Sequence, residues 1–222
     1  MIKEFTFTVV CAALAIAGAQ GAQQSAAEQA QQAKQERAQA ELDVPKLVEQ
    51  LELKPGMTVA DVGAGGGAMT VVLGKWIGSG HVFATDIGAR QLATIREYVT
   101  REGLSNVTVL EGAAASTNLP EACCDAVFLQ LVYHHIKEIE PFNKSLLASL
   151  KPGGRLAIID SVPAKGSKIP DGVPANREGH GIPISVVIAE VSASGLTQVR
   201  TIDKWPPGDK NPAGFLVLFR KP

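Results

Sequence analysis

The residues best placed to do chemistry are two aspartates and the glycines beside one of them. Asp61 is followed by glycines at 63, 65 and 67, and Asp86 lies 25 residues further along the chain. Glycines let a backbone turn sharply and approach a ligand closely, and a helix starting after them offers unpaired amides. An acidic residue at the end of the next strand is where a ribose diol binds in such folds. The pair therefore predicts a nucleoside site with Asp61, Gly63, Gly65, Gly67 and Asp86.

Two kinds of nucleoside cofactor fit this loop. Gly63, Gly65 and Ala68 also satisfy the G-x-G-x-x-A pattern of dinucleotide-binding proteins. Asp61 argues against that reading, because a carboxylate two residues before the first glycine would oppose a pyrophosphate but could serve a cationic methionine moiety. A surface aspartate beside a purely structural turn is the third alternative.

Histidines are the candidate catalytic residues, on the side of the site where a substrate is expected to bind. His134 and His135 follow the fourth predicted strand, and His180 lies in the loop before the last predicted helix. A histidine titrates near neutral pH and can act as a general base. Packing or capping of the following helix is the alternative role for each of them.

Strands that alternate with helices must position these residues. Strands are predicted at 58–62, 81–86, 107–111, 126–131 and 154–160, and helices at 44–53, 68–77, 89–102, 136–150 and 184–194. This order is typical of an α/β fold with a mostly parallel, Rossmann-like sheet and helices on both faces. Two last strands, 197–203 and 213–219, are joined by a segment too short for a crossover helix, so they should pair antiparallel.

The domain resembles the class I S-adenosylmethionine-dependent methyltransferases. The D-x-G-x-G-x-G motif is matched from Asp61 to Gly67, the second acidic position by Asp86, and the motif before strand five by Leu150-Lys-Pro-Gly-Gly154. The run 125–135, which contains Gln130, is similar to the fourth motif. The resemblance implies a seven-stranded sheet with a C-terminal antiparallel strand. It also implies that Asp61 and the glycines hold the methionine end of S-adenosyl-L-methionine, that Asp86 holds its ribose, and that Gln130 contributes to the same site.

Two positions depart from the family pattern. Gly112 is followed by Ala113, where the family often has an aspartate that meets the adenine amino group. Loss of such a charge-assisted hydrogen bond costs about 1.5 to 3 kcal/mol. Ala68 stands where the family commonly has an aromatic residue. We expect Gly112 and Ala113 to line the adenine end of a site whose affinity is weakened, not abolished.

The N-terminal segment has the composition of an export signal. An apolar run ends in Ala17-Gly18-Ala19, an A-x-A cleavage site, and is too short for a permanent membrane span. We expect residues 1–19 to be a signal peptide, with a periplasmic or secreted product that keeps no stable membrane insertion. A retained transmembrane anchor is the alternative for the segment, and a cytoplasmic location is the alternative for the protein. Residues 20–42, rich in Ala, Gln and Glu, predict a helical spacer before a methyltransferase domain at 43–222. The Tyr133-His134-His135 run and the terminal segment 215–222 are similar to an exported subgroup of the family.

Charge and cysteine content exclude other classes of protein. The formal net charge is −1, without any run of basic residues, which argues against a nucleic-acid partner. Cys123 and Cys124 are adjacent, and a bridge between neighbours conflicts with ordinary disulfide geometry, so free thiols are expected, with a soft-metal site as the alternative.

Three functions remain open. We expect a methyltransferase that acts on a small-molecule acceptor. The alternatives are an exported binding protein that keeps the fold without turnover, and an NAD(P)-dependent oxidoreductase.

Overall fold

The computed structural model describes residues 8–208 and 214–222, with side chains from residue 27 onward. The chain divides into two compact units, residues 1–39 and 40–222. The helix α1 (Thr8–Leu51) continues through the boundary between them, so the predicted spacer is helical and no separate helix begins at residue 44. Alanine, glutamine and glutamate all favour helix, which accounts for the lack of a break. Among the described residues, no helix is both long enough and apolar enough to cross a bilayer.

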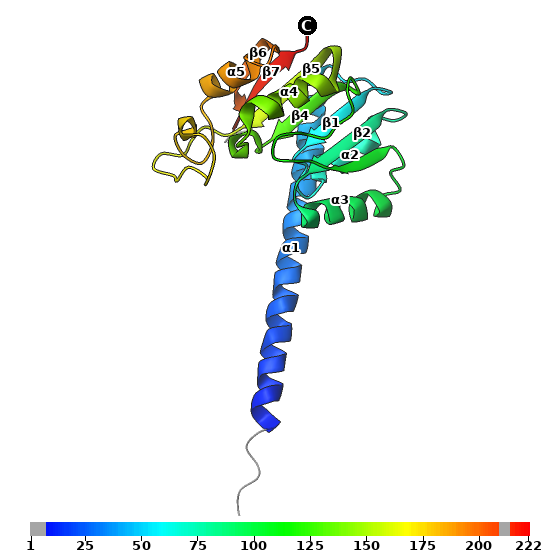
Figure 1. Ribbon diagram of the computed structural model, residues 1–222. Coiled ribbons are helices and arrows are strands. Elements are labelled where there is room, and N and C mark those ends of the chain that lie inside the picture. Colours follow the sequence, from blue (N-terminus) through cyan, green and yellow to red (C-terminus); the bar gives the residue numbers. More distant parts are fainter. Residues whose placement is uncertain (1–7, 209–213) are drawn as a thin grey trace, which may run out of the picture. The chain divides into compact units, whose positions relative to one another are not determined.

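A seven-stranded sheet organises the second unit (Figure 1). Its order is β3-β2-β1-β4-β5-β7-β6. The pairs among the first five strands of that order are parallel, and β7 pairs antiparallel with both β5 and β6. The predicted fold class is therefore confirmed, with β7 as the antiparallel strand. The strands are β1 (Thr58–Val62), β2 (His81–Asp86), β3 (Val107–Glu111), β4 (Cys124–Gln130), β5 (Leu150–Asp160), β6 (Thr197–Trp205) and β7 (Gly214–Arg220).

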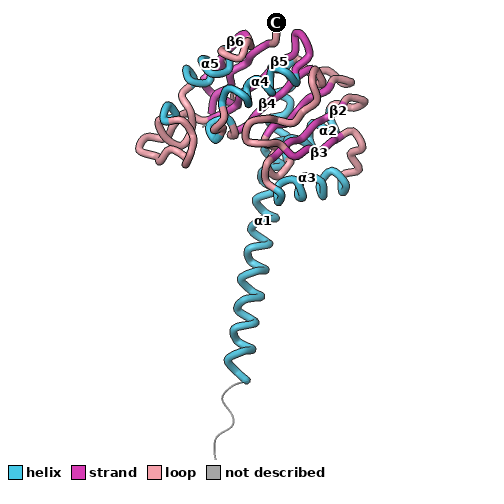
Figure 2. Tube along the Cα trace, in the orientation of Figure 1, coloured by secondary structure: helices cyan, strands magenta, loops and turns pink. Residues whose placement is uncertain are grey.

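Helices cover both faces of this sheet (Figure 2). They are α2 (Ala68–Trp76), α3 (Ala89–Arg101), α4 (Ile139–Ser149) and α5 (Ile184–Ser192). One apolar cluster joins Phe142 and Leu146 of α4 and Val187 of α5 to the sheet. A second cluster joins the end of α1 and Leu73 of α2 to the opposite face. Burial of these two clusters fixes the strands in their order, and with it the positions of the loops at the strand ends.

Helix α4 begins later than the sequence predicts. A 3-10 turn, η1 (Tyr133–His135), follows β4, and α4 starts only at Ile139. The turn is held by the backbone bond from the amide of His135 to the carbonyl of Val132. Pro141 fits the first turn of a helix, where no amide donor is needed, which favours a start just before it. The prediction of helix from residue 136 was therefore wrong by three residues.

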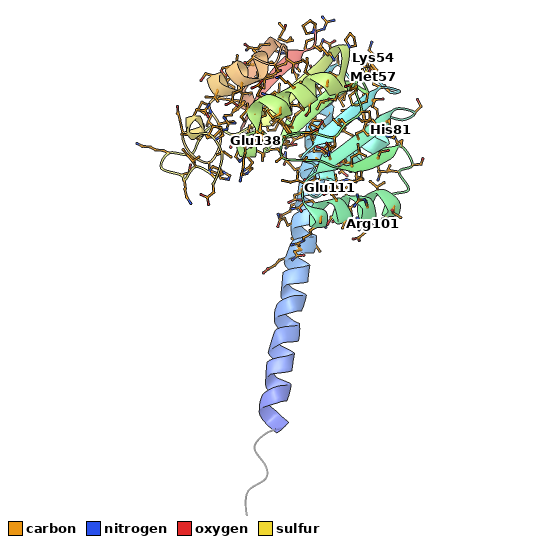
Figure 3. The ribbon with its side chains drawn as sticks, in the orientation of Figure 1. Lys54, Met57, His81, Arg101, Glu111 and Glu138 are labelled. Atoms are coloured by element: carbon orange, nitrogen blue, oxygen red, sulfur yellow. A yellow bond between two sulfur atoms is a disulfide. The ribbon has the colours of Figure 1, made fainter. Side chains whose placement is uncertain are left out.

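The parallel strands all end on one edge of the sheet. Figure 3 labels Met57 and His81, which stand at the amino ends of β1 and β2, and Glu111, which ends β3 at the opposite edge. The glycine loop after β1, Asp86 at the end of β2 and the turn η1 after β4 all lie at the carboxyl-end edge. Open α/β sheets bind their ligands at this edge, beside the strand where the order reverses, which is β1 here.

Candidate cofactor site and histidine cluster

The glycine loop after β1 is built from left-handed backbone. Gly63, Gly65 and Gly67 have φ angles of 74°, 54° and 77°. A Cβ at Gly63 would stand 2.5 Å from the side chain of Val132, so this glycine is needed for packing against the segment after β4. A Cβ at Gly65 would meet no heavy atom within 4 Å. The loop is therefore packed at Gly63 and open at Gly65, which is where a ligand could approach the backbone.

Asp86 connects the loop to the next strand. Its Oδ2 accepts a hydrogen bond of 2.9 Å from the amide of Gly65, and its Oδ1 accepts one of 2.9 Å from the amide of Gly88. The carboxylate therefore fixes the glycine loop and the start of α3 together. Each carboxylate oxygen has further lone pairs, so the carboxylate can still accept hydrogen bonds from the two hydroxyls of a ribose.

Asp61 is buried at the base of the same loop, with 3% of its surface exposed. Thr70 on α2 donates a hydrogen bond of 2.6 Å from Oγ1 to its Oδ2. Burial, and to a smaller extent the nearby charge of Asp86, raise the pKa of Asp61 to about 7, although the hydrogen bond from Thr70 opposes both. A carboxyl poised in this way becomes fully ionised when a cationic group is placed beside it.

Gln130 ends β4 next to this loop. Its Oε1 is buried and has no hydrogen-bond partner among the described residues. Buried polar atoms are normally paired, so this acceptor at the strand end is available to a donor of a bound ligand. Leu131, the next residue, is 52% exposed and has a φ of 57°.

The segment after β3 lies beside Asp86. The amide of Gly112 donates to the carbonyl of Asp86, and Ala113 is exposed and forms an isolated bridge with Ser116. Ile87, which follows Asp86, is 70% exposed and presents a large apolar side chain at this place on the surface. Together these residues offer an apolar surface without a carboxylate, suited to one face of a flat base.

The residues present fit S-adenosylmethionine. The open space at Gly65 accommodates a ligand against the backbone, and the Asp86 carboxylate can accept hydrogen bonds from two ribose hydroxyls. The buried Asp61 can face the cationic methionine moiety, and Gln130 Oε1 can accept a hydrogen bond from the ligand. All four predicted positions come together at one edge of the sheet.

Three histidines form a cluster beyond this loop. The ring centroids of His134 and His135 are 3.9 Å apart, those of His134 and His180 are 4.8 Å apart, and those of His135 and His180 are 5.3 Å apart. His180 is brought there by its loop, because the amide of Ile182 donates to the carbonyl of Ser161 directly after β5. The three histidines predicted as candidate catalytic residues therefore lie together in the structure.

His134 is held by a fully buried carboxylate. Asp160, at the end of β5, accepts a bond of 2.7 Å from Nδ1 of His134 through Oδ1 and one of 3.0 Å from the amide of His134 through Oδ2. Nε2 of His134 is buried and has no partner among the described residues. Burial lowers the pKa of the His135 ring below its usual value, and the neighbouring His134 and His180 lower it further. The ring of His135 therefore favours its neutral form.

Sequence reasoning missed three residues that support these sites: Thr70, Ile87 and Asp160. Asp160 was assigned only to the end of a strand. An aspartate at the end of a buried strand, beside two predicted sites, could have been identified as a site residue from the sequence. Thr70 was hidden inside a predicted helix, and Ile87 gave no signal until its exposure was known.

The expectation for the cysteines was wrong. The structure joins Cys123 and Cys124 in a disulfide instead of leaving two free thiols. Ala122, directly before the pair, has a φ of 47°. A soft-metal site on these two sulfurs is not compatible with the bridge.

Comparison with known proteins agrees with the geometry. Residues 60–158 match the family described as a methyltransferase domain. A demethylmenaquinone methyltransferase from Listeria monocytogenes is 30% identical over 112 residues, which cover 50% of this chain and 47% of that protein. The chain spans about half the length of the curated relatives it matches.

Solved structures share the fold. A SAM-dependent methyltransferase from Aquifex aeolicus is 27% identical, with a TM-score of 0.64 over 80% of this chain and 89% of that chain. Phosphoethanolamine N-methyltransferase 2 from Haemonchus contortus, solved with S-adenosyl-L-methionine, is 16% identical, with a TM-score of 0.62 over 79% of this chain and 51% of that chain. The second likeness shows the fold alone.

The antiparallel β7 between β5 and β6 also separates this sheet from the 3-2-1-4-5-6 order of dinucleotide-binding folds. The sheet order, the acidic strand ends around the glycine loop and the matched residues 60–158 together show that this domain is similar to the class I S-adenosylmethionine-dependent methyltransferases.

Proposed function

We propose that this chain transfers a methyl group from S-adenosylmethionine to a small-molecule acceptor. The observation that carries the proposal is the convergence at one sheet edge of Asp61, Gly65, Asp86 and the unpartnered Gln130 Oε1. When bound, the cofactor supplies an activated methyl group on its sulfonium. The protein's task is then to bind both reactants and align them, since positioning alone can contribute about 7 to 11 kcal/mol to such a step.

The acceptor is proposed to bind on the histidine side of the glycine loop. Val132 connects the two regions, because it packs against Gly63 and is followed directly by η1. A neutral imidazole there can take the proton that the acceptor loses, and the lowered pKa of His135 keeps that ring neutral at physiological pH. The names of the relatives make the ring carbon of a demethylated quinone one candidate acceptor atom.

Export is part of the proposal. The apolar N-terminal segment and its A-x-A site support cleavage after Ala19. The Cys123–Cys124 bridge is compatible with an oxidising compartment, where disulfides persist.

A binding protein without turnover is the second candidate. It is favoured by the exposed Ala113 and by Ala68, where the family pattern has groups that contact and enclose the cofactor. Oxidoreductase activity with NAD(P) is a third and weaker candidate, since the sheet order differs from that of dinucleotide-binding folds.

Calorimetric titration separates these candidates. The purified chain is titrated with S-adenosylmethionine, S-adenosylhomocysteine and NAD, and release of S-adenosylhomocysteine is then followed with a panel of acceptors that includes a demethylated quinone. Binding of the two methionine nucleosides with acceptor-dependent release supports the proposal. Tight binding without release from any acceptor favours the binding protein, and binding of NAD alone would reject both.

A further inference from the structure

The histidine cluster has a feature that proton transfer does not explain. Each of His134, His135 and His180 offers one ring nitrogen, and the three nitrogens all lie within 4.8 Å of one another. They come from two segments far apart in the sequence, the turn η1 after β4 and the loop after β5. A general base needs one imidazole, whereas three imidazoles with ring nitrogens this close together are typical of a metal ligand set.

The second observation is the buried nitrogen of His134. Nδ1 of this ring is bonded to Asp160 at 2.7 Å, and in a neutral ring this bond assigns the proton to Nδ1 and the lone pair to Nε2. That Nε2 is buried and has no partner among the described residues. A buried acceptor without a partner destabilises the fold, so it is retained where a ligand satisfies it.

Asp160 has the surroundings of a group that orients a metal ligand. Its side chain is fully buried, and its two oxygens accept from the ring of His134, the amide of His134 and the amide of Ser161. Metal-bound histidines commonly donate their other ring nitrogen to such a carboxylate, which fixes the tautomer and strengthens the ligand. Among the described residues, no lysine or arginine forms an ion pair with Asp160, and its one such partner is the ring of His134.

We propose that His134, His135 and His180 bind a divalent transition-metal ion of the zinc class, with Asp160 as the positioning residue for His134. Imidazole nitrogen suits zinc, nickel, cobalt and copper, and disfavours magnesium and calcium, which prefer oxygen. Three protein ligands leave a coordination position of a tetrahedral ion to water or to another small molecule. In the metal-bound form the ion uses the lone pair of His135, so the proton-accepting role proposed for this ring belongs to the metal-free protein.

The cluster can close onto an ion with small movements. Tetrahedral zinc with bonds of about 2.0 to 2.1 Å holds its nitrogen ligands about 3.3 Å apart. His134 is fixed by Asp160, whereas His135 and His180 have exposed side chains that can rotate toward it.

Metal titration of the full chain tests the proposal. The protein is prepared without a histidine tag, treated with a chelator, dialysed, and titrated calorimetrically with zinc chloride and then, separately, with cobalt(II) chloride. We expect one equivalent of zinc to bind, and we expect bound cobalt(II) to show the intense visible absorption of tetrahedral coordination. Substitution His180→Ala or His135→Ala should weaken zinc binding by about 100-fold, and Asp160→Asn by about 10- to 100-fold.

The fourth histidine of the chain provides a matched control. His81, labelled in Figure 3, lies at the amino end of β2, where its Nε2 is bonded to Thr108 at 2.9 Å. The substitution His81→Ala should leave zinc affinity unchanged. Zinc binding that is absent from the wild type, or that survives in the His135→Ala, His180→Ala double variant, would overturn the proposal. Loss of zinc binding in His81→Ala alone would overturn it as well.

The result is independent of the proposed methyl transfer. S-adenosylmethionine is titrated into the same variants, and we expect His180→Ala to keep its affinity for this nucleoside while losing zinc. If the wild type binds zinc but not S-adenosylmethionine, the metal site stands and the proposed function fails. If Asp160→Asn does not fold, the exposed positions 135 and 180 still decide the question.

Discussion

The carboxylate of Asp86 accepts a hydrogen bond of 2.9 Å from the amide of Gly65, 21 residues earlier in the chain. The acidic end of β2 therefore holds the glycine loop of β1 in place before any ligand binds. A loop that is already ordered loses less conformational entropy on binding, which favours affinity. The same carboxylate is the group expected to accept the ribose hydroxyls, so its loss should affect both stability and binding.

We expect Asp86→Ala to weaken S-adenosylmethionine binding by about 30- to 1,000-fold, which corresponds to about 2 to 4 kcal/mol. The variant should also lose about 1 to 3 kcal/mol of stability, because the amides of Gly65 and Gly88 lose their acceptor. Calorimetric titration and denaturant unfolding measure the two effects.

Asp125→Ala is the matched control for this variant. The Asp125 carboxylate also accepts from a backbone amide, that of Thr58 at 2.8 Å, and pairs with Lys151, but it lies at the amino ends of the strands. Its loss should lower stability and leave cofactor affinity unchanged. Equal losses of affinity in Asp86→Ala and Asp125→Ala would show that general destabilisation, not a ribose contact, weakens binding.

Asp61 should make cofactor binding depend on pH. Its pKa in the folded protein is about 7, so the carboxyl is largely neutral at pH 6 and ionised at pH 8. A cationic ligand prefers the ionised form, so affinity for S-adenosylmethionine should rise from pH 6 to pH 8. Asp61→Asn should bind weakly and without this pH dependence, and Thr70→Val, which removes the opposing hydrogen bond, should move the midpoint above pH 7.

The stability of the ligand-free protein should change in the opposite sense. The folded pKa of Asp61 is raised above its ordinary value of 3.8, so the folded state holds an extra proton between pH 4 and pH 7. Its contribution is therefore present below pH 4 and is lost as pH rises through 7, by up to about 4 kcal/mol. Asp61→Asn should be more stable than the wild type at pH 8 and closest to it at pH 4. A constant difference across this range would contradict the raised pKa.

The sequence predicted the structure well where the residues with chemical roles lie at the ends of strands that have a clear local pattern. The bounds of β1, β2 and β3 were predicted from short apolar runs bounded by glycine or proline turns, and Asp61 and Asp86 followed as strand ends. The bond between His134 and Asp160 could not be predicted, because it joins residues 26 apart through the pairing of β4 with β5. A tertiary contact of this kind, which also shapes the turn before α4, depends on side chains that no local pattern connects.

Gly65→Ala tests whether the open space in the loop is ligand space. Alanine at a φ of 54° costs about 1 to 2 kcal/mol, and its Cβ would project into the region where no protein atom lies within 4 Å. We expect cofactor affinity to fall by more than the change in stability accounts for. Gly103→Ala is the matched control, because Gly103 has a φ of 66° and equally open surroundings but follows the far end of α3. Equal affinities in the two variants would assign the loop a structural role only.

Export predicts a defined N-terminus. If residues 1–19 form a signal peptide, the mature protein expressed in its natural host should begin at Gln20 and be found in the envelope or medium. Mass spectrometry of the fractionated protein measures this. Ala17→Leu and Ala19→Leu should block cleavage, because the site requires small residues. An intact Met1 on a soluble cytosolic protein would reject the prediction.

Ala113→Asp should restore the adenine contact that the family pattern has at this position. Ala113 is exposed and lies beside Asp86, so an aspartate fits without burying a charge. A carboxylate that accepts from the adenine amino group should tighten S-adenosylhomocysteine by about 10- to 150-fold, which corresponds to about 1.5 to 3 kcal/mol. The gain should disappear with S-inosylhomocysteine, whose base has no amino donor at that position. Ala114→Asp adds the same charge one exposed residue further along, and an equal gain there would mean that general electrostatics, not the proposed contact, tightens binding.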